Sequence, residues 1–339
     1  MLQRISREKI IFTLTIFLAV LIFLISLSVG KVHISYQEII YAFLNSNDEV
    51  NQNLILNFRL PKSLASVLVG IALPVAGFLM QELFKNPLAE PSVLGVTSMS
   101  SLGVGVVIFL FSILGLDNFL NNPWLLITAS FIGSILSLLL IIAFSFRIKS
   151  SASLIILGFM LTGISGAFIG FMQYFAPSDQ IKTFLMWGYG SLSGLSWEKI
   201  SVFALTVLIG LGLAFSTLRG ITGLLLGERY AMSLGINIKH LKILILLATA
   251  ILTASATAFT GPIGFIGLAI PHICRSILKT GDIKLLFRWI ILTGVLLMLI
   301  FSIITEIFPF GTLPINIITA LFGAPIVISI LLNNKLEIR

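Results

Sequence analysis

The sequence predicts an all-α polytopic membrane protein with ten transmembrane helices. Hydrophobic residues make up 58% of the 339 residues and charged residues only 10%, whereas a soluble globular protein is about a quarter charged. The mean hydropathy is +1.11. The apolar runs continue for about 20 residues without alternating, which favours membrane-spanning helices over the strands of a β-barrel. This composition excludes a soluble enzyme, a nucleic-acid-binding protein and a disordered chain.

Ten apolar segments, taken in order, give the predicted spans. The first follows Arg4, Arg7 and Lys9, a basic start that resembles a signal peptide. No small-x-small cleavage site ends this segment, so we expect it to be retained as the first span. The segments lie at roughly 10–29, 63–84, 93–114, 123–144, 152–175, 199–218, 243–260, 263–278, 286–307 and 315–332.

The eighth segment is the weakest, because it is short and contains Pro271 and Arg275. However, residues 243–278 are too many for a single span at about 1.5 Å per residue. A helix should end at Gly261-Pro262, since proline removes a helical hydrogen bond. We therefore predict two spans here and ten in the chain.

Charge distribution predicts the orientation of these spans. With the N-terminus inside, 16 of the 21 Lys and Arg residues fall in inner segments. Basic residues collect on the cytoplasmic side of membrane proteins, so both termini should be cytoplasmic. This bias explains the net charge of +8 without a nucleic-acid partner. The basic residues of the outer segments are Lys31, Arg59, Lys62, Lys182 and Lys199.

Three connections are long enough to carry structure. Outside, residues 35–44 form a predicted amphipathic helix with Ser35 as N-cap and Glu38 at its third position. Residues 176–198, with glycines among aromatics, resemble a re-entrant or interfacial segment. Inside, residues 219–242 are the most polar long stretch of the second half, and we expect a cytoplasmic loop there.

The whole of 1–339 is interpreted as one transmembrane domain built from two inverted five-helix halves. Proline follows a polar residue or glycine just after the second span, at Asn86-Pro87, and just after the seventh, at Gly261-Pro262. These two spans cross the membrane in opposite directions. Five spans per half would make the halves inverted repeats, which are common in transporters.

Catalytic and nucleotide-binding motifs are absent from the sequence. It contains no P-loop, no H-E-x-x-H, no C-x-x-C and no G-x-S-x-G, so we expect neither an enzyme nor a bound metal or cofactor. Its single cysteine excludes an internal disulfide. Glu82 and Glu306 are the only acids near the spans, and neither has an evident partner for a coupling-ion site. The energy for transport should therefore come from a separate protein.

The inner loop contains a short predicted helix. Glu228, Ala231 and Leu234 are three residues apart and would share one helix face, and Gly235 can end the helix. Such a helix, held below the membrane, could dock a soluble partner. The pattern alone favours an ordinary surface helix between two spans over a docking helix.

Four blocks in order make the chain resemble the FecCD-type permease family of ABC importers for iron-siderophores, haem and vitamin B12. They are R-L-P-K at 59–62, N-P-L-A-E-P with L-G-V at 86–96, the loop 227–237, and G-P-I-G-F-I-G-L with I-P-H and Arg275 at 261–275. A smaller match lies at 313–325. The resemblance covers about residues 10–332.

The resemblance implies a subunit of the cytoplasmic (inner) membrane that works as a homodimer around one pathway. Two copies of a cytoplasmic P-loop ATPase would dock from inside, and a substrate-binding protein would deliver cargo outside. The leading cargo is an iron-siderophore chelate, with haem or cobalamin as alternatives from the same family. An ion-coupled secondary carrier is the alternative from another class.

The resemblance also implies roles for three groups of residues. The ATPase-coupling residues would be Gly227, Glu228, Ala231, Leu234 and Gly235. The inner gate would comprise Asn86, Pro87, Leu88, Ser150 and Ser151. The binding protein would dock on Arg59 and Lys62, although simple snorkelling to the interface is an alternative for both side chains.

Two departures from the family pattern concern the outer side. Lys62 replaces the usual second arginine, which loses a bidentate donor and keeps the charge. The ninth span reads F-S-I-I-T-E at 301–306 and lacks the usual Asp and Arg. We therefore expect the contacts normally made from that position to differ in this chain, with Glu306 in a different role.

Overall fold

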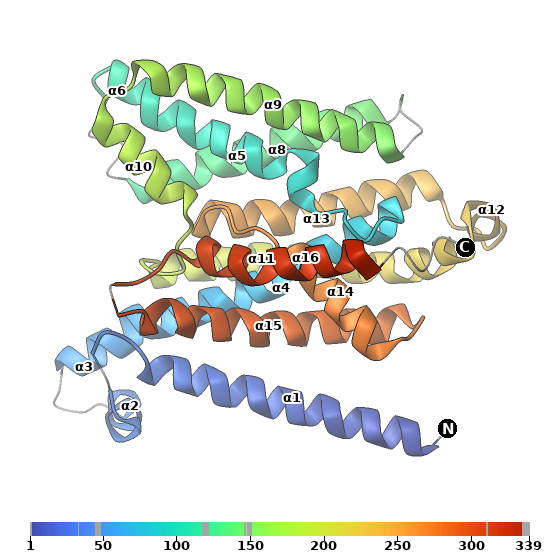
Figure 1. Cartoon of the computed structure of the whole chain (residues 1–339), viewed down its shortest axis with the longest axis horizontal. Helices are drawn as coiled ribbons and strands as arrows, with labels where there is room; N and C mark the ends of the chain where they lie inside the picture. Colours follow the sequence, from blue (N-terminus) through green and yellow to red (C-terminus); the bar gives the residue numbers. More distant parts are fainter. Residues whose placement is uncertain are drawn as a thin grey trace.

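A computed structural model describes residues 2–32, 34–44, 49–116, 122–145, 147, 151–309 and 311–333. These residues form helices and connecting turns, with no strand in the described ranges. The long helices lie side by side in one bundle (Figure 1). In chain order the helices are α1 (Leu2–Ser28), α2 (Tyr36–Phe43), α3 (Glu49–Asn53), α4 (Leu60–Phe84), α5 (Val96–Gly105), α6 (Phe111–Ile113), α8 (Pro123–Ser145), α9 (Ser151–Phe175), α10 (Ser178–Gly188), α11 (Trp197–Leu225), α12 (Glu228–Ser233), α13 (Ile238–Thr260), α14 (Ile266–Leu278), α15 (Ile283–Ile307) and α16 (Ile315–Asn333).

Within the described ranges, eight helical stretches are long and apolar enough to cross a bilayer. They correspond to the predicted spans except the eighth and the tenth. Those two match the shorter apolar helices α14 and α16. The all-helical fold class is thus confirmed, and the count of ten crossings stays a prediction. The eight stretches are Glu8–Ser28, Val50–Phe84, Val96–Ile113, Pro123–Phe144, Ser153–Phe175, Trp197–Leu225, Ile238–Thr260 and Ile283–Ile307.

The bundle has two distinguishable ends (Figure 1). The start of α1 and the short helix α12 lie at one of them, here called the α12 end. The short helices α2, α3 and α6 lie at the other, called the α2 end. The predicted capping box is present in α2, because the Ser35 side chain accepts from the Glu38 amide and Glu38 accepts from the Ser35 amide.

Helix α4 lies in the centre and contacts α11, α13, α14 and α15. Glycines allow two of these contacts to be unusually close. A Cβ placed on Gly70 would lie 2.6 Å from the Gly294 carbonyl oxygen, and one on Gly77 would lie 1.8 Å from that of Gly267. Small residues at helix contacts let backbones approach inside a membrane, so α4 is fastened to both α15 and α14.

The chain turns back after α4 and again after α13, at the two positions where proline follows a polar residue or glycine. Positive φ angles mark both turns, at Lys85 (φ 48°) and at Gly261 and Phe265 (φ 73° and 68°). Each turn leads into a further helix, α5 in the first case and α14 in the second. These two interruptions meet inside the bundle, because Glu90 accepts a hydrogen bond from the Phe265 backbone amide.

Candidate functional site

The predicted short helix in the inner loop is present as α12, between α11 and α13. Gly227 precedes it with φ 107°, and Gly235 follows it with φ 80°. The amides of Gly235 and Ile236 donate to the carbonyls of Met232 and Ala231. Such a left-handed glycine turn closes a helix without steric cost.

Helix α12 packs on α11 through Ala231, which is fully buried. A Cβ on Gly223 of α11 would lie 3.6 Å from the Ala231 Cβ. On either flank of Ala231, α12 exposes Tyr230 and Met232, and Leu234 follows the helix equally exposed. Sequence spacing placed Ala231 on the docking face, but its side chain instead anchors the helix. Tyr230 and Met232, which spacing missed, are the apolar groups available to a partner.

A surface ion pair joins α12 to α13. The Lys242 Nζ atom lies 2.8 Å from Glu228 Oε1. Both side chains are about half exposed, and such pairs contribute about 0–1 kcal/mol to stability. Glu228 therefore remains accessible at the surface beside Tyr230.

The predicted gate segment, residues 86–88, lies directly after α4. The Asn86 side chain accepts from the Leu88 amide at 2.9 Å, and the Asn86 carbonyl accepts from the Ala89 amide at 3.0 Å. These two bonds make a tight turn that Pro87 is suited to occupy. Ser150 lies outside the described residues. Ser151 begins α9, and its side chain is likewise outside the description.

A cavity of about 380 Å³ lies between the gate segment and the last turn of α11. Charged and polar side chains form one wall, and apolar side chains of α11 form the other. It is lined by Gln81, Glu82, Lys85, Asn86, Pro87, Ile221, Leu224, Leu225 and Arg275. The gate segment and α11, the helix that directly precedes α12, thus line the same cavity.

Glu82 has a partner that sequence reasoning missed. Arg275 on α14 donates to Glu82 Oε1 at 2.8 Å and also donates to the Gln81 side chain. Its guanidinium lies 5.8 Å from the centre of the Phe78 ring, a distance at which cation–π attraction contributes. Gln81 in turn donates to the Leu268 carbonyl at 3.3 Å. The sequence separation of 193 residues leaves no local signal for this pair.

Glu90 is a buried carboxyl enclosed between the turn that follows α4 and the turn that follows α13. It accepts from the Ser92 hydroxyl at 3.2 Å and from the Phe265 amide at the start of α14. Burial raises the pKa of Glu90 to about 7, and these two hydrogen bonds oppose the rise only in part. The carboxyl therefore titrates near neutral pH.

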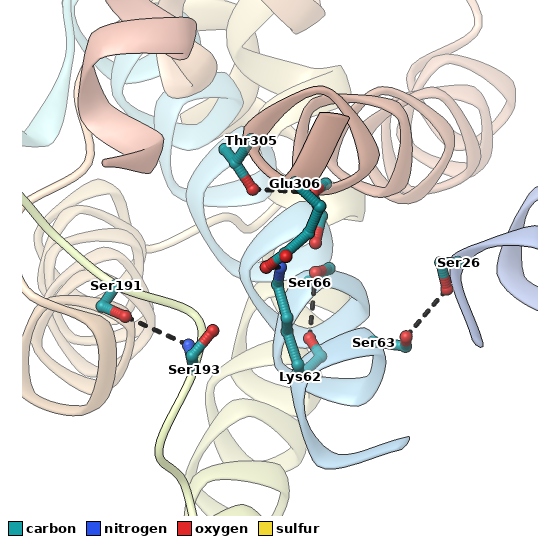
Figure 2. Close-up of polar contacts among 9 residues, drawn as sticks. Ser26, Lys62, Ser63, Ser66, Ser191, Ser193, Thr305 and Glu306 are labelled. Atoms are coloured by element: carbon teal, nitrogen blue, oxygen red, sulfur yellow. Dashed lines mark hydrogen bonds and ion pairs between the residues drawn. The ribbon is translucent and has the colours of Figure 1, made fainter. Parts of the chain in front are cut away.

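Lys62 and Glu306 form an ion pair at the α2 end, between α4 and α15 (Figure 2). Sequence reasoning found no partner for Glu306. The pair borders a cavity of about 240 Å³ whose other polar groups include Ser193 and Ser302. The Ser63 and Ser26 hydroxyls are hydrogen-bonded beside it, 2.7 Å apart.

Arg59 is buried, with 8% of its surface exposed. Its guanidinium donates to the carbonyls of Leu27 and Ser28, both at 2.7 Å, and to that of Val32. This fork of donors ties the end of α1 to the start of α4. The two predicted docking residues therefore make different interactions. Lys62 pairs with a carboxylate, whereas Arg59 donates to backbone carbonyls.

Comparison with known proteins identifies the family. A family model described as the FecCD transport family matches residues 18–333. The hemin transport system permease protein HmuU of Yersinia pestis is 31% identical over 329 residues, covering 93% of this chain and 94% of the relative. The molybdate import system permease protein MolB of Haemophilus influenzae is 32% identical over 328 residues, covering 95% of this chain and 94% of that relative.

A third relative and a solved structure agree with this. The vitamin B12 import system permease protein BtuC of Vibrio cholerae is 32% identical over 312 residues and covers 91% of each chain. An inward-facing structure of a metal-chelate-type ABC transporter superposes with a TM-score of 0.83 at 30% identity, covering 96% of this chain and 99% of that one. The chain therefore belongs to the FecCD transport family and is an ABC importer permease, a multi-pass protein of the cytoplasmic (inner) membrane.

Proposed function

We propose that two copies of this chain line the translocation pathway of an ATP-driven importer for iron-siderophore-type chelates. A separate P-loop ATPase docks on α12 at one end, and a substrate-binding protein delivers the cargo at the other. The observation that carries this proposal is α12 itself. It is a short helix between two glycine turns, anchored by Ala231 and exposing Tyr230 and Met232.

In this proposal the α12 end is cytoplasmic and the chain crosses the membrane ten times. The bias of basic residues supports the orientation. The tenth and eighth crossings are made by α16 and α14. At the α2 end, the Thr260 carbonyl accepts from the Ser191 amide at 2.7 Å, so α13 reaches that end before the chain returns. Residues 261–265 with α14 then make the return crossing.

Helix α9 supports the homodimer. Ile156 and Phe159 of this helix are more than half exposed. On the same face of the helix, a Cβ on Gly163, Gly166 or Gly170 would meet nothing within 4 Å. Large apolar groups interleaved with small residues suit close packing of helices in a membrane. A second copy of this chain would cover that face.

At the opposite end, Arg59 and Lys62 contribute to binding-protein docking in different ways. The Arg59 guanidinium is committed to backbone carbonyls, so it shapes the rim and presents no free charge. Lys62 meets the partner together with Glu306, as an ion pair. The rim is therefore closer to neutral than one built from two free arginines.

Reconstituted transport tests the proposal. The chain would be co-purified with its ATPase and binding protein, placed in proteoliposomes, and offered a ferric siderophore, haemin, cobalamin and molybdate in separate assays. The proposal predicts uptake of the ferric siderophore that needs ATP and no ion gradient. If haemin or cobalamin alone were taken up in an ATP-dependent way, that compound would be assigned as the cargo instead. Uptake driven by a proton or sodium gradient without ATP would show a secondary carrier instead.

A further inference from the structure

Two carboxylates on either side of the gate segment contact the same helix, α14. Glu82 precedes the segment and pairs with Arg275, in the last turn of α14. Glu90 follows the segment and accepts from the amide of Phe265, the residue directly before α14. Ten residues of helix rise by about 15 Å. The gate segment is therefore tethered at two points near opposite ends of α14.

Helix α14 is also fastened to α4 along the length between these tethers. The Gln81 side chain bridges Arg275 and the Leu268 carbonyl. A Cβ on Gly77 would lie 1.8 Å from the Gly267 carbonyl oxygen, and a Cβ on Gly267 would lie 2.9 Å from the Leu73 carbonyl oxygen, so the two helices pack backbone to backbone. A group of elements joined by packing, hydrogen bonds and an ion pair is expected to move as one body. The end of α4, the gate segment and α14 form such a body.

Helix α11, which directly precedes α12, faces this body across the 380 Å³ cavity. Leu224 and Leu225 of α11 line one wall, and Glu82 and Arg275 line the other. Because Ala231 is buried against α11, a displacement of α12 would carry the last turn of α11 with it. The last turn of α11 would then press on the opposite wall of the cavity. That wall contains the Glu82–Arg275 pair.

We propose that α14 is the strut that moves the gate segment, and that Glu82, Arg275 and Glu90 are the positioning residues that attach the gate to it. ATPase-driven displacement of α12 reaches the gate through α11, the Glu82–Arg275 pair and α14. This inference rests on the proposed function, since it assumes an ATPase at α12 and a gate at residues 86–88. It assigns no contact with cargo to these three side chains.

The test measures gate exposure directly, in the complex with the ATPase subunits in proteoliposomes. A Leu88→Cys reporter is placed in a Cys274→Ala background, and its modification by N-ethylmaleimide is timed with and without ATP. Glu82→Gln, Arg275→Gln and Glu90→Gln are compared with this parent. Each should lower the ATP-dependent change in labelling rate by about tenfold, which corresponds to a coupling free energy of about 1.4 kcal/mol. Recovery of the ATPase with the permease should stay unchanged.

A charge-exchanged variant and a control make the result specific. Glu82→Arg combined with Arg275→Glu restores the pair in reverse and should regain most of the ATP dependence. Arg288→Gln, which removes an exposed cation of α15, should behave as the parent. Normal ATP-dependent labelling in all three single variants, with a responsive parent, would overturn the strut alone. If ATP did not change the labelling rate of the parent, that result would overturn the proposed function and the role of α14 with it.

Discussion

The ammonium group of Lys62 and the carboxylate of Glu306 form an ion pair across 244 residues of sequence, joining the start of α4 to the end of α15. Their side chains are only 14% and 16% exposed. Removing one partner would leave a charge that is largely shielded from water, and such a loss costs more than the loss of a surface pair. The pair thus fixes the α2 end of two neighbouring spans.

Lys62→Met or Glu306→Gln should therefore destabilise the purified chain by about 2 kcal/mol, an intermediate value between exposed and fully buried pairs. Thermal unfolding in detergent measures this. The exchanged variant, Lys62→Glu with Glu306→Lys, should recover most of the loss. Lys242→Ala, which breaks the exposed pair with Glu228, provides the matched control and should change stability by less than about 1 kcal/mol. Equal losses at both pairs would contradict the burial argument.

The Arg59→Lys variant should be less stable than the parent. A lysine ammonium is a compact donor and cannot reproduce the fork that reaches the carbonyls of Leu27, Ser28 and Val32. Buried carbonyls left without donors cost about 1–3 kcal/mol each, so unfolding should occur at a clearly lower temperature. Lys182→Met, at an exposed cation of α10, should leave the unfolding temperature unchanged. A stable Arg59→Lys protein would show that the guanidinium fork is dispensable.

Glu90 should make stability depend on pH near neutrality. Its pKa is raised to about 7 in the folded chain, against about 4.3 for an unperturbed glutamate. Between these values the folded state holds a proton that the unfolded state has released, so stability falls as pH rises. Unfolding temperatures measured from pH 5 to pH 8 should decline in the parent. The decline should be smaller in Glu90→Gln and unchanged in Glu198→Gln, which alters an exposed acid. An identical slope in parent and Glu90→Gln would contradict this assignment.

The gate prediction concerns Leu88 and Ser151. A charge at Leu88, or a bulky residue at Ser151, should block transport and leave ATPase recovery intact, because neither residue belongs to α12. Leu88→Asp and Ser151→Trp would be compared with the parent for ATP-dependent uptake of a ferric siderophore. Cysteines at the two positions should react with small reagents from the inner side in at least one nucleotide state. Cysteines that never react would place both residues away from the pathway.

Local features of the structure were predictable from sequence, because they depend on neighbouring residues. The capping box of Ser35 and Glu38 and the glycine turn at Gly235 are of this kind. The lengths of most spans follow from uninterrupted apolar runs. A shorter apolar helix such as α14 was harder to count, because its 13 residues fall short of the length of a full span.

The long-range contacts were not predictable from one sequence. The partners of Glu82 and Glu306 lie 193 and 244 residues away, and nothing near either acid indicates which cation it meets. The orientation of α12 illustrates a second limit. A spacing of three shows that Glu228, Ala231 and Leu234 lie near one another, but which side of the helix touches α11 depends on packing. Ala231 is buried there while Leu234 is exposed.

The central claim, that α12 couples this permease to a separate ATPase, is tested most directly by recovery of the ATPase with α12 variants. Ala231→Arg should push α12 off α11, because the buried methyl group has no room for a guanidinium. Gly235→Val should strain a turn that needs positive φ. Both variants should insert normally, since neither residue lies in a membrane-spanning helix.

The measurement is the amount of ATPase that co-purifies with the tagged permease, followed by ATP-dependent uptake in proteoliposomes. We predict a well-inserted permease that loses most of its ATPase, or keeps it without coupling ATP hydrolysis to uptake. Tyr230→Ala with Met232→Ala should give the same loss while leaving α12 in place. Full ATPase recovery and normal uptake in all these variants would show that α12 is only a surface connection between α11 and α13.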